Sequence, residues 1–156
     1  MYGIIATWRM ALEGISKADS MLKNNESAAD SIEEAIKAVE DFEYYKSVGY
    51  GGLPNEEMEV ELDAAFMDGD TLEFGCVGGI KDFANPVSIA RSLMHYDANN
   101  FLIGQGAEKY ASRHGFERKT MLTDRAKIHY HNRTKEITNT ELKPYLDKAN
   151  VGVSFV

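Results

Sequence analysis

A β-hairpin signal over residues 60–77 is the feature that most constrains the fold of this chain. Residues 60–67 and 71–77 have the pattern of two strands, and Asp68-Gly69 between them is a favoured tight hairpin turn. In the first strand apolar residues alternate with acidic ones, which predicts one buried and one wet face. Because hairpins are unusual in doubly wound parallel sheets and helical patterns flank this one, we expect an α+β fold with a mixed sheet.

Helical patterns surround the predicted hairpin. The clearest covers residues 27–41, where Ile32, Ile36 and other apolar residues recur at helical spacing with acidic residues between them. Asn85-Pro86 predicts a helix start, because Asn is a good N-cap and Pro is tolerated at the first helical position. The other expected elements are helices over residues 9–22 and 106–114 and short strands over residues 3–8 and 101–104.

The pattern fades in the last part of the chain. Residues 120–147 are mostly polar and charged, which predicts helical turns and then a tail that is poorly ordered over residues 126–150. Residues 151–156 alternate weakly and are compatible with a last short strand. Since the chain contains no repeat and no low-complexity tract, residues 1–156 are expected to form a single domain.

Composition argues against several classes of protein. The net charge of −8 argues against a general nucleic-acid binder, which needs a basic patch. Cys76 is the one cysteine, so no internal disulfide forms, and its apolar neighbours predict a buried structural thiol. The sequence has no leader-like segment and no apolar run of roughly 18 residues, so we expect a cytoplasmic protein that does not enter a membrane.

Residue spacing alone identifies no catalytic site. The chain has no phosphate loop and no dinucleotide fingerprint. His129 and His131 stand two residues apart, but a metal site needs three or four ligands, so a solvated polar face is favoured over metal binding. His95 and His114 lie near predicted helix ends, where a cation complements the helix dipole.

A series of short motifs then follows a recognisable order along the chain. The motifs are Ala6-Thr7-Trp8, Ser47-Val48-Gly49-Tyr50-Gly51-Gly52, and residues 62–69, 77–80, 87–94 and 101–104, followed by Ala107, Tyr110 and Ala111. In this order and spacing they resemble the glycosylasparaginase branch of the N-terminal-nucleophile hydrolases. The resemblance covers roughly residues 3–125, which is most of that family's N-terminal (α) segment.

The resemblance implies half of a four-layer αββα fold and amide hydrolysis without a cofactor. In the family, a precursor cleaves itself in front of a threonine, whose hydroxyl is the nucleophile and whose α-amine is the base. The hydroxyl attacks the side-chain amide of asparagine or of a glycosylated asparagine. An oxyanion hole stabilises the formation of a β-aspartyl ester, and water then releases aspartate. The implied partners are therefore a second (β) segment that carries the threonine, the small-molecule substrate, and further copies in an oligomer.

Four positions match the substrate side of the family's site. Trp8 matches a tryptophan that lines the substrate pocket as a rigid apolar wall; a core tryptophan is the alternative. Ser47 matches a serine close to the catalytic threonine; a turn serine bonded to its own backbone is the alternative. Gly49 and Gly51 would shape that loop, and Asp63 is expected to support its strand rather than react.

The resemblance fails near residue 150. The family has His-Asp and then Thr-Val/Ile-Gly there, whereas this chain has Lys148-Ala149-Asn150-Val151-Gly152. Asn150 then stands at the nucleophile position, and its side chain has no hydroxyl, so we expect the isolated chain to be inactive. Three interpretations stay open: an enzyme half that needs its second segment, a catalytically inactive binding or assembly domain, and a product without selected function.

Overall fold

The computed structural model describes residues 1–139 and the side chains of residues 1–135. Its elements confirm the predicted α+β class, because helices are combined with a mixed sheet. None of the helices in this described part is long and apolar enough to cross a membrane. In chain order the elements are the 3₁₀ turn η1 (Arg9–Ala11), α1 (Leu12–Lys23), α2 (Ala28–Glu40), β1 (Glu61–Met67), β2 (Phe74–Lys81), α3 (Pro86–Leu93), β3 (Phe101–Ile103), α4 (Gly104–Arg113) and α5 (Asp124–Asn139).

The sheet has the order β1-β2-β3. β1 and β2 form the predicted antiparallel hairpin, and β3 runs parallel to β2 after the crossover through α3. The predicted tight turn at Asp68-Gly69 is wrong, because residues 68–73 form a longer loop between the strands. The Asp68 carboxylate organises that loop by accepting hydrogen bonds from the backbone N–H groups of Asp70 (2.8 Å) and Thr71 (3.1 Å). Because the Asp68 side chain pairs with two backbone N–H groups of the loop, the longer loop is stabilised without a two-residue turn.

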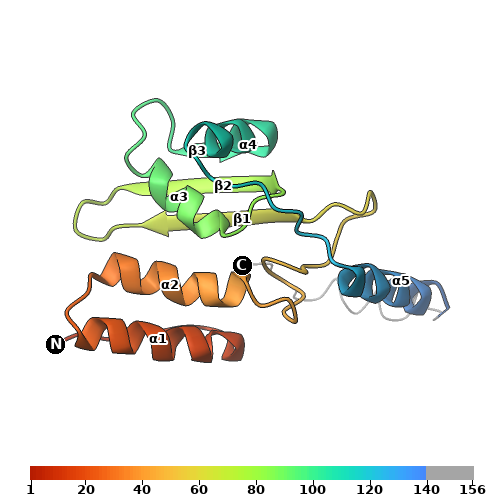
Figure 1. Cartoon of the computed structure of the whole chain (residues 1–156), viewed down its shortest axis with the longest axis horizontal. Helices are drawn as coiled ribbons and strands as arrows, with labels where there is room; N and C mark the ends of the chain where they lie inside the picture. The colour runs from red at the N-terminus through yellow and green to blue at the C-terminus, as the bar shows by residue number, and fades with distance from the viewer. Residues whose placement is uncertain (140–156) are drawn as a thin grey trace, which may run out of the picture.

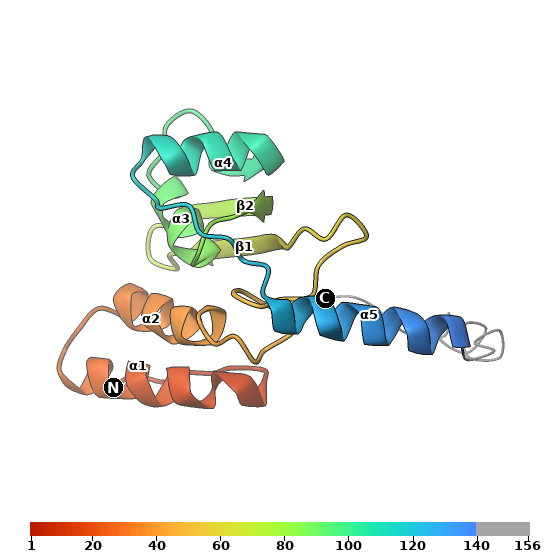
Figure 2. The same ribbon diagram turned by 45° about the vertical axis from the view of Figure 1, so that its right-hand side comes forward.

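The two faces of the sheet differ in their surroundings. α3 and α4 cover one face: Figures 1 and 2 show α3 lying across β1 and β2, and α4 beyond the strands as seen from α1. The core lies beneath them and includes Phe66, Val77, Ile80, Ile89 and Leu93. The opposite face exposes four large apolar side chains, whose exposed fractions are 60% for Met67, 44% for Phe74, 55% for Phe101 and 66% for Ile103. This face is therefore apolar but has no covering layer among residues 1–139.

α1 and α2 form a pair beside the sheet, with α2 on the nearer side (Figure 1). The prediction over residues 27–41 is confirmed, because Ser27 caps α2 by accepting the Asp30 N–H at 3.0 Å. Gly14 of α1 faces the backbone of Ala35 so closely that a Cβ there would overlap its carbonyl group. The two helices therefore approach each other at a glycine.

The strand predicted over residues 3–8 is wrong. These residues form no strand and are largely exposed, with Ile5 at 95% and Trp8 at 63%. A strand needs a neighbour for its backbone N–H and C=O groups, and no described strand lies beside this segment. The segment instead runs along the apolar side of the α1–α2 pair.

Two smaller predictions at residue level also need correction. Asn85 precedes α3 as predicted, but it has left-handed backbone angles and its side chain does not cap the helix. Cys76 lies in the middle of β2 with Ala65 and Phe101 as its strand neighbours, and it is half-buried rather than fully buried.

The C-terminal prediction is tested only in part. α5 supplies the helical turns predicted after residue 120. The poor order predicted over residues 126–150 stays a prediction. Asn150 and the strand considered over residues 151–156 lie outside the described residues.

Candidate functional site

The glycine-rich loop of residues 47–52 packs against the end of α2. Gly49 and Gly51 have φ values of +62° and +80°, which favour glycine. A Cβ on Gly49 would overlap the carbonyl group of Glu40, and a Cβ on Gly51 would lie 2.7 Å from the carbonyl oxygen of Glu43. The sequence therefore places glycines where the loop backbone touches the backbone of the preceding segment.

Backbone hydrogen bonds fix this loop on two sides. The Tyr50 N–H donates to the Glu40 carbonyl oxygen at 2.7 Å, and the Gly51 N–H donates to the Met121 carbonyl oxygen at 2.9 Å. The first bond joins the loop to the end of α2, and the second joins it to the segment that precedes α5. Ser47 is thus carried by a loop whose position is set by distant parts of the chain.

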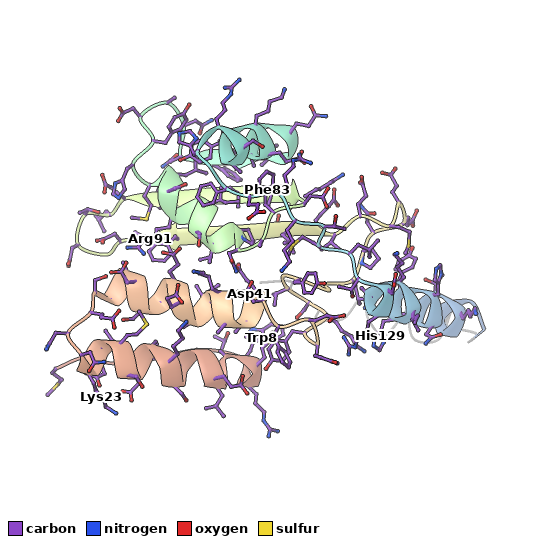
Figure 3. All side chains as sticks on the ribbon, in the orientation of Figure 1. Trp8, Lys23, Asp41, Phe83, Arg91 and His129 are labelled. Carbon is purple, nitrogen blue, oxygen red and sulfur yellow. The ribbon has the colours of Figure 1, made fainter. Side chains whose placement is uncertain are left out.

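Trp8 and Ser47, the two side chains predicted at the site, border one groove. Its volume is about 670 Å³, and its floor is the apolar side of the α1–α2 pair. Figure 3 shows Trp8 close to the C-terminal end of α2. The apolar side chains of the helices that line the groove include Ile15, Ile32, Ile36 and Val39. The structure therefore brings together two residues far apart in the sequence, on an apolar surface with little polar lining.

A second, smaller hollow of about 370 Å³ adjoins the groove at Ser47 and Val48. Gly49 borders this hollow, together with residues of β1 and the start of α3, whereas Gly51 borders neither. Asp63 of β1 also borders it, but its carboxylate accepts the Gly79 N–H at 2.7 Å. This bond ties β1 to β2, in agreement with the supporting role predicted for Asp63.

Glu40 is a buried carboxyl group at this hollow that the sequence reasoning missed. Only 7% of the residue is exposed. Its side-chain oxygens accept hydrogen bonds from the backbone N–H of Val87 and from the side-chain amide of Asn85, both at 3.3 Å. Burial raises the pKa of Glu40 to about 7, and these two hydrogen bonds oppose the rise. The available signal was the spacing of four from Ile36, which puts an acidic residue on the buried stripe of α2.

Charged side chains join α2 to α3 beyond the hollow. Arg91 of α3 contacts the Asp30 carboxylate at 2.7 Å and forms a closer ion pair with Glu33. The Ser88 hydroxyl donates to the other oxygen of Glu33. Figure 3 shows Arg91 reaching from α3 toward α2. The helix pair is therefore held to the sheet region by a polar network on one side and by Glu40 on the other.

The histidines do not assemble a metal site among the residues that the structure describes. No three His, Cys, Asp or Glu side chains lie close enough there to hold an ion. His129 and His131 lie on α5, where residues two apart point to different sides. His114 follows the last residue of α4 and bonds through Nδ1 to the Tyr110 carbonyl oxygen at 2.8 Å, and His95 lies 3.4 Å from the Glu73 carboxylate.

Comparison with known proteins gives consistent matches over most of this chain. The family model for asparaginase matches residues 6–151. An N(4)-(beta-N-acetylglucosaminyl)-L-asparaginase from Elizabethkingia miricola is 34% identical over 120 residues, which are 77% of this chain and 35% of the relative. An isoaspartyl peptidase/L-asparaginase from Rattus norvegicus is 37% identical over 124 residues, which are 75% of this chain and 37% of the relative. A plant-type L-asparaginase from Thermococcus kodakarensis is 38% identical over 121 residues, which are 78% of this chain and 35% of the relative. The chain thus spans about a third of the length of these relatives.

Proposed function

The chain belongs to the asparaginase family of N-terminal-nucleophile hydrolases, and on this premise we propose that it supplies one wall of the site of an asparagine-type amidohydrolase. The matched residues cover about a third of the length of these relatives, and in this proposal the complete activity also uses a further segment. That segment carries the nucleophilic threonine. The substrate is the side-chain amide of asparagine or of a glycosylated asparagine.

The observation that carries the proposal is that Trp8 and Ser47 border the same groove. Trp8 is 63% exposed, so its indole is free to form a flat apolar wall with one N–H donor. The loop that carries Ser47 is fixed by backbone hydrogen bonds at both Tyr50 and Gly51, which suits a positioning surface. The apolar floor formed by α1 and α2 supports the docking of the second segment here.

The reaction follows from placing a threonine against this wall. Its α-amine takes the proton of its own hydroxyl, and the hydroxyl oxygen attacks the substrate's side-chain carbonyl carbon. The nitrogen of the substrate amide takes the proton from the α-amine and leaves as ammonia or a glycosylamine. A β-aspartyl ester forms, and water then cleaves the ester to release aspartate and restore the hydroxyl. In this scheme the present chain contacts the substrate but supplies no nucleophile, because Asn150 stands at the threonine's position in the alignment of motifs.

The same reasoning extends to the fold. A sheet with helices on one face only is what half of a four-layer αββα arrangement would look like. We propose that the second segment adds strands against the exposed face that contains Phe101 and Ile103.

The test combines this chain with a second segment. The segment is the C-terminal remainder of the Elizabethkingia miricola relative, produced with an N-terminal threonine. Released aspartate is measured with asparagine and with aspartylglucosamine. We expect release from the mixture only, a reduction of at least roughly tenfold with Trp8→Ala or Ser47→Ala, and no change with Ser112→Ala on the exposed side of α4. If the two segments bind each other and neither substrate yields aspartate, the proposed function is wrong.

A second candidate function is a catalytically inactive assembly domain. The exposed apolar face of the sheet favours it, because large exposed apolar patches mark interaction surfaces. Sedimentation of the purified chain tests this candidate. A monomer at all concentrations, without binding of an apolar dye, would argue against an assembly surface.

A further inference from the structure

Glu40 joins its own helix to two parts of the chain that are distant in the sequence. It is the last residue of α2. Its backbone carbonyl oxygen accepts the Tyr50 N–H at 2.7 Å, and the Gly49 backbone lies directly against it. Its side chain reaches the N-terminal end of α3 instead. One residue therefore contacts both the glycine-rich loop and the helix that covers the sheet.

The side chain of Glu40 caps the N-terminal end of α3. Pro86 has no N–H, and the Val87 N–H at the next position has no partner within the helix. The side chain of Asn85 makes no capping bond, because it points to α2 and donates to Glu40 and to Asp41, the latter at 3.0 Å. The Glu40 carboxylate replaces the Asn85 side chain as the capping group and accepts a hydrogen bond from the Val87 N–H. A negative group is favourable there because it faces the positive end of the helix dipole.

We propose that Glu40 is a positioning residue that couples the glycine-rich loop, and with it Ser47, to the N-terminal end of α3. The link to the substrate wall rests on the proposed function, because it takes Ser47 to be part of that wall. The coupling itself is a property of this chain alone.

The charges around Glu40 make the coupling dependent on pH. Glu33 on its own helix and Asp41, which directly follows the helix, are negative neighbours that favour the protonated form. From α3 the groups that face it are the Asn85 amide and the Val87 N–H, which favour the carboxylate. β1 brings Glu61 and Asp63 to the same hollow, and residues 47–52 of the loop include no carboxylate and no cation. Because burial raises the pKa of Glu40 to about 7, its charge changes near neutral pH.

Backbone amide NMR of the full chain tests the coupling directly. The ¹⁵N-labelled protein is titrated from about pH 5 to pH 9, and the signals of Val87 and Tyr50 are followed. We expect both signals to shift with one common midpoint near 7, because one carboxyl group governs both sites. Glu40→Gln keeps the size of the side chain but cannot ionise, so both titrations should be lost. Glu56→Gln, at an exposed position of a loop, is the matched control and should keep both.

Two results would overturn the proposal. Titration of Val87 without Tyr50 would show that Glu40 caps α3 without acting on the loop. Titration of both signals in Glu40→Gln would assign the effect to another group. If Glu40→Gln does not fold, Asn85→Gly provides the second variant, because glycine tolerates the positive φ of +50° at this position. It removes a hydrogen bond to the carboxylate, so the common midpoint should rise, and an unchanged midpoint contradicts the coupling.

These readouts need neither the second segment nor activity. A failure of the coupling is therefore distinct from a failure of the proposed function. The first appears in the amide titrations of this chain, and the second appears in the release of aspartate by the assembled pair.

Discussion

Among single residues, Glu40 is exceptional because a carboxyl group is buried at the junction of a helix end, a loop and a second helix. The ion pairs of α2 and α3 show the contrasting case. Glu33 and Asp30 meet the guanidinium of Arg91 and remain partly exposed, so they contribute little to stability through charge alone. Glu40 meets no cation in any ion pair formed by residues 1–135, and only neutral donors face it.

This difference gives a prediction for stability against pH. The pKa of Glu40 is about 7 in the folded chain and near 4.5 when unfolded. Between these values the unfolded chain has already released the proton, so the contribution of Glu40 to stability is complete below about pH 4.5 and is lost as pH rises through 7. In Glu40→Gln the side chain cannot ionise, so the variant does not lose this stability as pH rises. Its free energy of unfolding relative to wild type should therefore rise by roughly 3 kcal/mol between about pH 4 and pH 8.

Urea unfolding at a series of pH values measures this difference. Glu56→Gln is the control, since its side chain is exposed and the difference from wild type should stay flat. A flat difference for Glu40→Gln as well would mean that the buried carboxyl group keeps its ordinary pKa.

At the level of elements, the close approach of α1 and α2 reverses the usual effect of a helical glycine. Gly→Ala inside a helix normally stabilises by about 0.5–1 kcal/mol. At Gly14 the added Cβ would overlap the carbonyl group of Ala35, so Gly14→Ala should destabilise by about 1–3 kcal/mol. Gly106 in α4 has no atom within 4 Å of its would-be Cβ, and Gly106→Ala should stabilise.

Thermal and urea unfolding of the two variants show whether each change raises or lowers the free energy of unfolding. Both changes add one methyl group to a helix, so helix propensity cancels in the comparison. If both variants are stabilised, α1 and α2 do not approach each other at Gly14.

The elements also show which parts of the structure a sequence can specify. The helix after Ser27 and the β1–β2 pair were predictable, because periodicity and capping are local properties of a few neighbouring residues. The segment of residues 3–8 was mispredicted as a strand, because strand formation depends on a partner that periodicity does not report. The cap of α3 was assigned to Asn85 for a similar reason, since the actual acceptor comes from Glu40 in another helix.

The candidate site also contains residues that the sequence predicted and one that it did not. Trp8 and Ser47 were predicted from their motifs, and the structure adds that they share a groove. Glu40 carries no motif of its own. Its role depends on contacts with Val87 and Tyr50 that only the folded chain creates.

For the whole molecule, the exposed face of the sheet dominates the expected behaviour in solution. Met67, Phe74, Phe101 and Ile103 lie on that face with at least 44% of each residue exposed. We expect the isolated chain to bind an apolar dye and to self-associate with rising concentration, because burial of this face removes apolar surface from water.

Replacement of two residues on β3 tests this expectation. Phe101→Ser with Ile103→Ser should reduce dye fluorescence and self-association while the circular dichroism of the fold is kept. Ile128→Ser on α5 removes an equally exposed apolar side chain away from the sheet and serves as the control. Equal dye binding by all three proteins would contradict the role of this face.

The bond between the Gly51 N–H and the Met121 carbonyl oxygen has a consequence for the order of folding. The α1–α2 and β1–β2 pairs join neighbours along the chain and close short loops, so their contacts form early. The Gly51–Met121 bond joins residues far apart in the sequence, so its loop-closure entropy is larger and we expect it to form later. The loop that carries Ser47 therefore reaches its final position among the last parts of the chain. In pulse-labelling hydrogen exchange during refolding, the Gly51 amide should gain protection later than the amides of α2.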